Sequence, residues 1–277
     1  IRKNDLKKDE IIETLNKNFI YLIIEFYEMQ TEFMSVINKE LKDIDKGYII
    51  FFIMSKLFEK IDVKEKDFQS FSTENYKLSI NNFKIIDLVN GLSIPKETVR
   101  RKIDELINNN LLKYNNKNMT INFNQKSIIN IFKNNIQTSS KFISKFSVFY
   151  SRVRMFGSEF TQKEVEKKII DNFELNFQLF VTFQLNYYKI WKDTIKDFNL
   201  VLIFLLCALN NFYLIRKNYP EKSKIDLKKT FTTIHKLNYQ RGLNATSISE
   251  LSSIPRATVI RKMKWFFDHK LITKDKN

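Results

Sequence analysis

The sequence predicts a mainly α-helical protein with an internal pseudo-repeat. Two observations lead to this fold class. The phrase SIPKETVRRKI at residues 93–103 returns as SIPRATVIRKM at residues 253–263, and the two copies hold two of the three prolines of the chain. Elsewhere, apolar residues recur at steps of three and four over long stretches, which is the spacing of amphipathic helices.

The repeated phrase lies within a longer alignment. Ser93–Leu112 and Ser253–Ile272 align without gaps, and eight of these twenty positions are identical. Such repetition predicts that the chain consists of two diverged copies of one unit, residues 1–157 and residues 158–277. Weaker similarity pairs two earlier segments of each copy: Tyr48–Phe58 with Val201–Asn211, and Asn18–Phe26 with Asn176–Gln184.

A long amphipathic helix is predicted at the start of the first copy. Its apolar stripe runs from Ile11 to Leu41, and Gly47 is the expected break after it. The spacing of apolar residues from Ile128 to Val153 predicts a further helix between the two copies.

The second copy is predicted to open in the same way. Its apolar stripe runs from Ile169 to Phe198, and Thr161 and Glu164 have the spacing of a capping box near the start of the helix. Helices this long and this aromatic carry more apolar surface than one small unit can bury. We therefore expect them to pack between the two copies or between two chains.

Each copy of the phrase is predicted to form the second helix of a helix–turn–helix, at residues 84–110 and 246–270. Pro95 and Pro255 suit the first position of that helix, where the missing N–H has no partner to lose and φ is already helical. In the second copy, Ser247 is the predicted N-cap of the preceding short helix.

Residues 111–124 follow the first helix–turn–helix and predict a β-hairpin. The stretch LLKYNNKNMTINF reads as a strand, an NNKN turn and a second strand, and Asn readily takes the positive φ of a tight turn. A helix–turn–helix followed by a hairpin with a basic tip is the winged-helix arrangement. In the second copy LITKDKN begins the same hairpin, and this wing is expected to be truncated at Asn277.

The two modules resemble a known group of proteins. SIPKETVRRKIDELINNNLL and SIPRATVIRKMKWFFDHKLI are similar to the recognition segments of bacterial winged-helix transcription regulators, especially the MarR-like and IclR-like groups. The shared features are a small turn, a Pro or Ser, a basic residue, Thr-Val, an Arg and a final apolar pair that leads into the wing. The resemblance implies DNA binding, although such regulators usually carry one module per chain.

The chemistry of the two phrases also suits DNA. An α-helix fits the major groove, where Arg can bond guanine and Thr can contact phosphate or a thymine methyl group, and two modules could occupy groove faces about 34 Å apart. The two helices differ at aligned positions, with Glu97 against Ala257 and Arg100 against Ile260. These differences predict an asymmetric DNA site, or one module that positions the protein on the DNA while the other determines the sequence specificity. The residues expected to bind DNA are Lys96, Glu97, Thr98, Arg100, Arg101, Lys102, Asn116 and Lys117 in the first module, and Arg256, Thr258, Arg261, Lys262, Lys264 and Lys274 in the second.

Composition agrees with a polyanionic partner. The formal net charge is +16 and the sequence pI is about 9.6, which favours nucleic acid first and an acidic membrane surface second. Because an A/T-rich genome also enriches lysine, we give this charge modest weight.

The longest apolar run, Leu200–Leu209, is about half the length of a bilayer span, so a membrane protein is not expected. The single cysteine, Cys207, fits a core position and a reducing cytoplasm.

Catalysis is not expected. We identify no phosphate-cradling glycine loop and no nucleophile–base pair in the sequence, so the chain is predicted to be no enzyme and to need no cofactor. Glu25, Glu28 and Glu32 share one helical face and read as a solvated surface, not as a metal site. His235 and His269 are isolated, so neither is expected to bind a metal.

These observations predict a cytoplasmic transcriptional regulator that binds double-stranded DNA in a sequence-specific manner. One alternative is a plasmid-type replication initiator, which also carries tandem winged helices. Another is a helical interaction protein that does not bind DNA. A small lipophilic effector could bind between the long helices and a module, and the chain is expected to act as a monomeric pseudo-dimer or as a homodimer.

Overall fold

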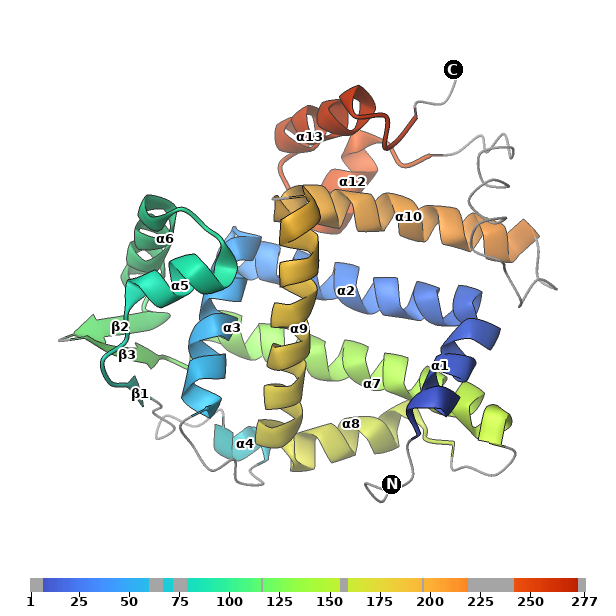
Figure 1. Ribbon diagram of the computed structural model, residues 1–277, viewed down its shortest axis with the longest axis horizontal. Helices are drawn as coiled ribbons and strands as arrows, with labels where there is room; N and C mark the ends of the chain where they lie inside the picture. The colour runs from blue at the N-terminus through green and yellow to red at the C-terminus, as the bar shows by residue number, and fades with distance from the viewer. Residues whose placement is uncertain are drawn as a thin grey trace. The chain divides into compact units, whose positions relative to one another are not determined.

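The computed structural model describes residues 7–59, 67–71, 79–115, 117–154, 159–195, 197–218 and 242–273 (Figure 1). These residues are mainly helical, with one small three-stranded antiparallel sheet. The prediction of a mainly α-helical fold is therefore confirmed.

Two compact units make up the chain. Unit 1 contains Ile1–Ser35, Gln137–Glu166 and Leu202–Asn277, and unit 2 contains Val36–Ile136 and Lys167–Val201. These units do not coincide with the predicted repeats, because each unit takes helices from both halves of the chain.

The first predicted long helix is two helices. Helix α1 (Lys8–Lys17) ends at Asn18, and α2 (Phe19–Leu41) begins directly after it. The side-chain amide of Asn18 donates to the carbonyl of Thr14 at 3.0 Å, so it competes with the backbone for an acceptor of the last turn. The apolar spacing continues across this break, which is why the sequence predicts one helix there.

The second predicted long helix is divided in the same way. Helix α8 (Gln162–Asp171) and α9 (Phe173–Ile195) are separated by Asn172, and they have the same lengths as α1 and α2, 10 and 23 residues. The capping box before α8 is confirmed. The hydroxyl of Thr161 accepts from the amide of Glu164 at 3.3 Å, and the Glu164 carboxylate accepts from the amide of Thr161 at 2.8 Å.

Helix α3 (Ile44–Phe58) follows α2 after a sharp break, and the predicted position of that break, Gly47, is wrong. The chain turns at Lys42, whose φ is 58°, and Asp43 caps α3 by accepting from the amide of Asp45 at 2.9 Å. Gly47 lies inside α3, where a Cβ atom would meet Cγ2 of Ile37 at 2.6 Å. The glycine therefore permits the close approach of α3 to α2.

Aromatic side chains build the core of unit 2. Tyr48 of α3 lies 4.3 Å from Tyr188 of α9, measured between ring centroids, and Tyr188 stacks on Phe198 at 4.3 Å. At the other end of α9, Phe177 packs against Phe132 at 4.5 Å. Phe132 belongs to α7 (Lys126–Arg154), the helix predicted between the copies. Helix α4 (Phe68–Phe71) also contacts this end, with Phe68 4.9 Å from Phe173.

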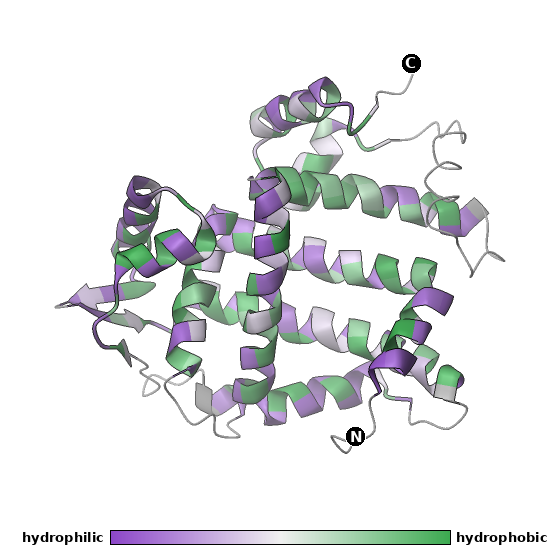
Figure 2. Ribbon diagram, in the orientation of Figure 1, coloured by the Kyte–Doolittle hydropathy of each residue, from purple (hydrophilic) through white to green (hydrophobic). Residues whose placement is uncertain are grey.

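The core of unit 1 includes α10 (Phe198–Asn218) from Leu202 onward, and Figure 2 shows this helix to be predominantly hydrophobic. Its buried Phe212 and Ile215 pack against Ile20 and Ile24 of α2. Among the described residues α10 alone is long and apolar enough to cross a membrane, over Phe198–Lys217, and 56% of that window is buried. A buried core helix has the same properties, and the ten-residue run seen in the sequence extends into this longer helix.

Candidate nucleic-acid interface

The first repeated phrase forms a tight turn and the helix after it in unit 2. Helix α5 (Ile85–Leu92) ends at Ser93, which has a left-handed φ of 50°, and α6 (Lys96–Asn108) follows. The buried Ile94 anchors the turn. Pro95 is the N-cap and not the first helical residue, because its carbonyl accepts the first intrahelical bond, from Val99 at 3.0 Å.

The second phrase has the same local backbone in unit 1. Helix α12 (Ala245–Ser252) ends at Ser253 with a φ of 57°, and α13 (Arg256–Asp268) follows Pro255. The carbonyl of Pro255 accepts from Val259 at 3.0 Å. The predicted N-cap of α12 is wrong, because the side chain of Asn244 accepts from the amides of Thr246 and Ser247 at 2.9 Å each.

Both second helices also end in the same way. After α6, Asn110 has a φ of 55° and the amide of Leu111 donates to Leu106 at 2.9 Å. After α13, Lys270 has a φ of 56° and the amide of Leu271 donates to the carbonyl of Phe266 at 3.0 Å. Each helix buries the same aligned positions: Val99 and Leu106 in α6, Val259 and Phe266 in α13.

A three-stranded sheet combines two strands that follow α6 with one that precedes α5 (Figure 1). Strands β2 (Leu112–Asn115) and β3 (Asn118–Ile121) form the predicted hairpin, with Asn115 opposite Asn118. Lys117 in the turn is exposed and has a φ of 63°, whereas Asn116 lies outside the described residues. The sequence did not predict β1 (Ser79–Ile80), which pairs with β3, because two residues carry too short a pattern.

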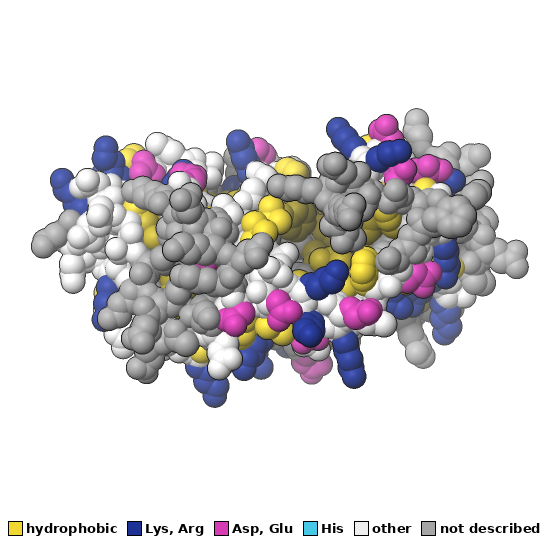
Figure 3. All heavy atoms as spheres, turned by 90° about the horizontal axis from the view of Figure 1, so that it is seen from below, with side chains coloured by type: hydrophobic (Ala, Val, Ile, Leu, Met, Phe, Trp, Pro, Cys, Tyr) yellow, Lys and Arg dark blue, Asp and Glu magenta, His cyan; other side chains and the backbone are white. Residues whose placement is uncertain are grey.

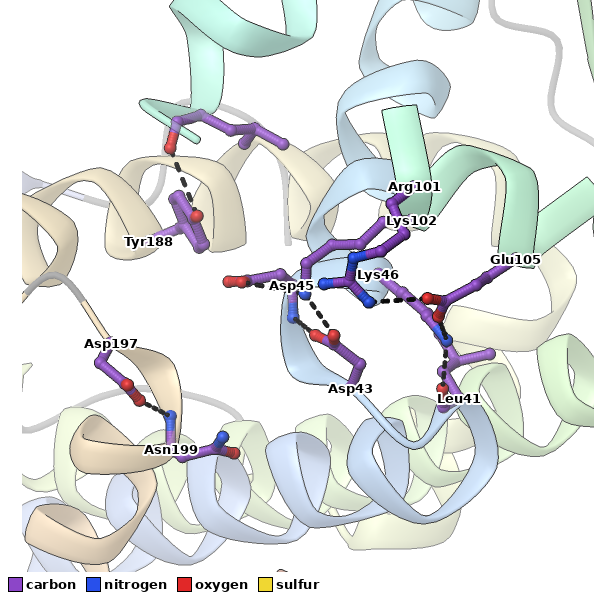
Figure 4. A network of polar contacts seen from close by, with 11 residues as sticks. Leu41, Asp43, Asp45, Lys46, Arg101, Lys102, Glu105, Tyr188, Asp197 and Asn199 are labelled. Carbon is purple, nitrogen blue, oxygen red and sulfur yellow. Dashed lines mark hydrogen bonds and ion pairs between the residues drawn. The ribbon is translucent and has the colours of Figure 1, made fainter. Parts of the chain in front are cut away.

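Lys102 is not on the exposed face of α6. Its side chain is only 6% exposed, and its ammonium group forms ion pairs with Asp43 and, at 3.3 Å, with Asp45. A second pair joins α6 to α3, between Lys46 and Glu105 at 2.6 Å. Figure 4 shows these side chains directed toward one another between the two helices. Lys102 therefore holds α6 on α3 and is not placed to contact a ligand.

Ion pairs within the helix occupy the arginines of α6. Arg100 pairs with Glu97 at 3.0 Å, and Arg101 pairs with Glu105 at 2.7 Å. The hydrogen bond from Lys46, together with the charges of Lys46 and Arg101, lowers the pKa of Glu105. Lys96 and Glu97 are exposed and Thr98 is half-buried, so the residues predicted in the first module, other than Lys102 and Asn116, lie at accessible positions.

The exposed face of α13 has a different character. Arg261 and Lys264 are exposed, and neither has an ion pair among the residues that the structure describes. The guanidinium of Arg256 donates to the hydroxyl of Thr246 at 3.1 Å, and the side chain of Ile260 is 46% exposed. Thr258 and Lys262 are half-buried, and Lys274 lies outside the described residues.

The charge of the whole chain does not by itself mark an interface. On the face drawn in Figure 3, Lys and Arg side chains are spread over the surface, with Asp and Glu between them. A candidate interface is therefore judged from the charged side chains of α6 and α13. On these two helices the backbone determines which side chains lie on the same face.

The glutamates of α2 are not all solvated, which corrects the sequence interpretation. Glu25 and Glu28 are largely buried and lie 3.7 and 2.6 Å from the ammonium group of Lys141 on α7. Burial raises the pKa values of Glu25 and Glu32. Burial opposes the charge of Lys141, but the hydrogen bond to Glu28 and the nearby carboxylates raise its pKa. Sequence periodicity places these residues on one face but does not reveal the helix that covers it.

In the described part of the chain, no group of three or more His, Cys, Asp and Glu residues could hold a metal ion. His269 stacks on Trp265 at 4.0 Å, and His235 lies outside the described residues. Burial raises the pKa of the Cys207 thiol to about 11, so it is protonated at neutral pH, as a core position requires.

In comparisons with known proteins, no family model, no curated protein and no solved structure matches this chain.

Proposed function

We propose that this chain is a transcriptional regulator that binds double-stranded DNA in a sequence-specific manner through two winged-helix modules. The observation that carries the proposal is the pair of helix–turn–helix segments with the same turn and capping geometry. In both, the second helix buries its apolar side and exposes basic residues. Helices of this kind enter the major groove in known DNA-binding proteins.

The element order around the first segment supports a winged-helix module. Helix α3, strand β1, helices α5 and α6, and the hairpin β2–β3 follow one another along the chain, and the strand order is β1-β3-β2. In this proposal the sheet is the wing of the module, and the turn at Lys117 is the tip of that wing. In the second module α10, α12 and α13 correspond to α3, α5 and α6.

Element lengths support two copies of one unit. The pairs α1 and α8, α2 and α9, α5 and α12, and α6 and α13 have 10, 23, 8 and 13 residues in both members. The break at Asn18 then corresponds to the break at Asn172. This register differs from the sequence pairing of Asn18–Phe26 with Asn176–Gln184, which the similar apolar spacing along the helix had favoured.

The DNA chemistry follows from side chains on the two second helices. The exposed Arg101 and Arg261 occupy the same aligned position and can form two hydrogen bonds to a guanine edge. Lys117 at the wing tip can contact the flanking phosphate backbone. Two modules in one chain would recognise a longer DNA site than one module does. Because the exposed faces of α6 and α13 differ, that DNA site would be asymmetric.

Two alternatives each have a supporting observation. Tandem modules also suit a plasmid-type replication initiator. The internal ion pairs of α6 suit an interaction protein, since they leave Arg100 and Arg101 partly neutralised. The cytoplasmic location, the lipophilic effector and the monomeric pseudo-dimer or homodimer stay predictions.

The direct test is selection of genomic DNA fragments by the purified full chain at moderate salt, followed by footprinting of the recovered sites. A regulator returns single sites near promoters, whereas an initiator returns iterated repeats at an origin. Recovery of no enriched sequence would favour the interaction protein and contradict the proposal.

A further inference from the structure

The exposed faces of α6 and α13 differ in charge although their backbones agree. At five aligned exposed positions, α6 carries three cations and two acids, whereas α13 carries three cations, two apolar residues and no acid. The aligned pairs are Lys96 and Arg256, Glu97 and Ala257, Arg100 and Ile260, Arg101 and Arg261, and Asp104 and Lys264.

The acids of α6 compete with any phosphate for its arginines. Arg100 already pairs with Glu97 at 3.0 Å, and Arg101 pairs with Glu105 at 2.7 Å. These partners lie three and four residues away on the same helix, so they stay within reach in any orientation of the module. A DNA phosphate near α6 would also meet the exposed carboxylate of Asp104.

The face of α13 offers cations without such competition. Arg261 and Lys264 are exposed and form no ion pair within the described residues. Arg256 is held by its hydrogen bond to Thr246 at 3.1 Å, which orients the guanidinium at the start of the helix. Between these cations lie Ala257 and Ile260, whose exposed apolar atoms suit the methyl group of thymine.

We infer that α13 is the principal DNA-contacting helix of the chain. Arg256, Arg261 and Lys264 bind phosphates and base edges, and Ala257 and Ile260 contact thymine methyl groups. Helix α6 contributes less to affinity because its cations are internally paired. This inference rests on the proposed function, since it assigns the affinity to one of the two proposed modules.

Two matched double variants test the assignment in the full chain. Arg261→Gln with Lys264→Gln removes two charges from α13, and Arg100→Gln with Arg101→Gln removes two from α6. Binding to the selected duplex is measured by fluorescence anisotropy over a salt series. The α13 variant is expected to bind at least about tenfold more weakly and to lower the slope of log affinity against log salt by about 2. The α6 variant is expected to stay within about threefold of wild type.

An exchange experiment guards against loss of binding through misfolding. Glu97→Ala with Asp104→Lys replaces the two acids among the five aligned positions of α6 with the residue types of α13, which leaves four cations and no acid there, so it is expected to tighten binding. In a selection from randomised duplexes, Ile260→Ser is expected to weaken the preference for thymine at one or two positions without changing the salt slope.

The outcomes separate this inference from the proposed function. Equal losses from the two charge-removing variants, no gain from the exchange, or an unchanged thymine preference would overturn the assignment to α13. If the wild-type chain binds no duplex even at low salt, the proposed function itself fails.

Discussion

The buried Lys102 of α6 forms an ion pair with the partly buried Asp43, the N-cap of α3, and Asp45 lies 3.3 Å from the same ammonium group. The side chain of Tyr188 strengthens the same region by donating to the carbonyl of Leu92, at the end of α5, at 3.3 Å. Helix α6, one of the two helices proposed to face DNA, is thus fixed to α3 by charge as well as by apolar packing. A fixed angle is what a recognition helix requires, because base contacts depend on its orientation.

Replacement of Lys102 tests this clamp. Lys102→Met keeps most of the side-chain volume but leaves two partly buried carboxylates without their cation, so we expect the free energy of unfolding to fall by about 3 kcal/mol. Urea denaturation at neutral pH measures it. Lys96→Met, on the exposed face of the same helix, is the matched control and should change stability by less than about 0.5 kcal/mol. Equal effects of the two variants would show that the pair does not hold α6.

Gly91 permits the close approach of α5 to Phe52 of α3. A Cβ atom at this position would lie 2.1 Å from Cε2 and 2.7 Å from Cζ of Phe52. Alanine has a helix propensity about 1 kcal/mol more favourable than glycine, but overpacking costs about 1–3 kcal/mol, so Gly91→Ala should destabilise the chain on balance. Asn90→Ala, at the exposed neighbouring position, gains propensity without the overlap and should be neutral or stabilising. Thermal unfolding of the two variants compares these effects, and a higher Tm for Gly91→Ala would contradict the packing described.

The environment of the Glu25 carboxyl group predicts that the stability of unit 1 depends on pH. Burial raises the folded-state pKa of this group above the ordinary value of a glutamate carboxyl group. Its contribution to stability is therefore fully present below that value and is lost as the pH rises through the raised pKa. Glu25→Gln should raise the free energy of unfolding at pH 7 and have little effect at pH 4. Urea midpoints at the two pH values test this, and a destabilised variant at pH 7 would mean that the pairing with Lys141 outweighs burial.

We predict that Lys117, exposed in the turn between β2 and β3, contacts phosphate and not bases. Because the residue has a φ of 63°, Lys117→Asn keeps a side chain that tolerates the turn while removing the charge. Binding should weaken equally for all duplex sequences, and the slope of log affinity against log salt should fall by about 1. Lys133→Asn, at an exposed position of α7, controls for the loss of one charge elsewhere. A changed base preference in Lys117→Asn would place the wing tip in a groove instead.

Local patterns in the sequence predicted the parts of the fold that neighbouring residues determine. Pro95 and Pro255 marked the starts of two helices within one residue, and Thr161 with Glu164 formed the expected capping box. The hairpin at Lys117 also followed from turn chemistry. Each of these features depends on residues at most a few positions apart.

Features that depend on distant partners escaped prediction. The burial of Lys102 requires Asp43 and Asp45, and the burial of Glu25 requires Lys141 on another helix. Periodicity also could not place the helix breaks at Asn18 and Asn172, because the apolar stripe continues through both. For the candidate site, the aligned phrases identified which positions share a face, but only the contacts show that the arginines of α6 are already paired.

The central claim is tested most directly by the affinity of the full wild-type chain for its selected duplex, compared with a random duplex of equal length, over a series of salt concentrations. We predict that the selected duplex binds at least about a thousandfold more tightly, and that log affinity for both falls linearly with log salt. Equal affinities for the two duplexes, or binding that does not change with salt, would contradict the account.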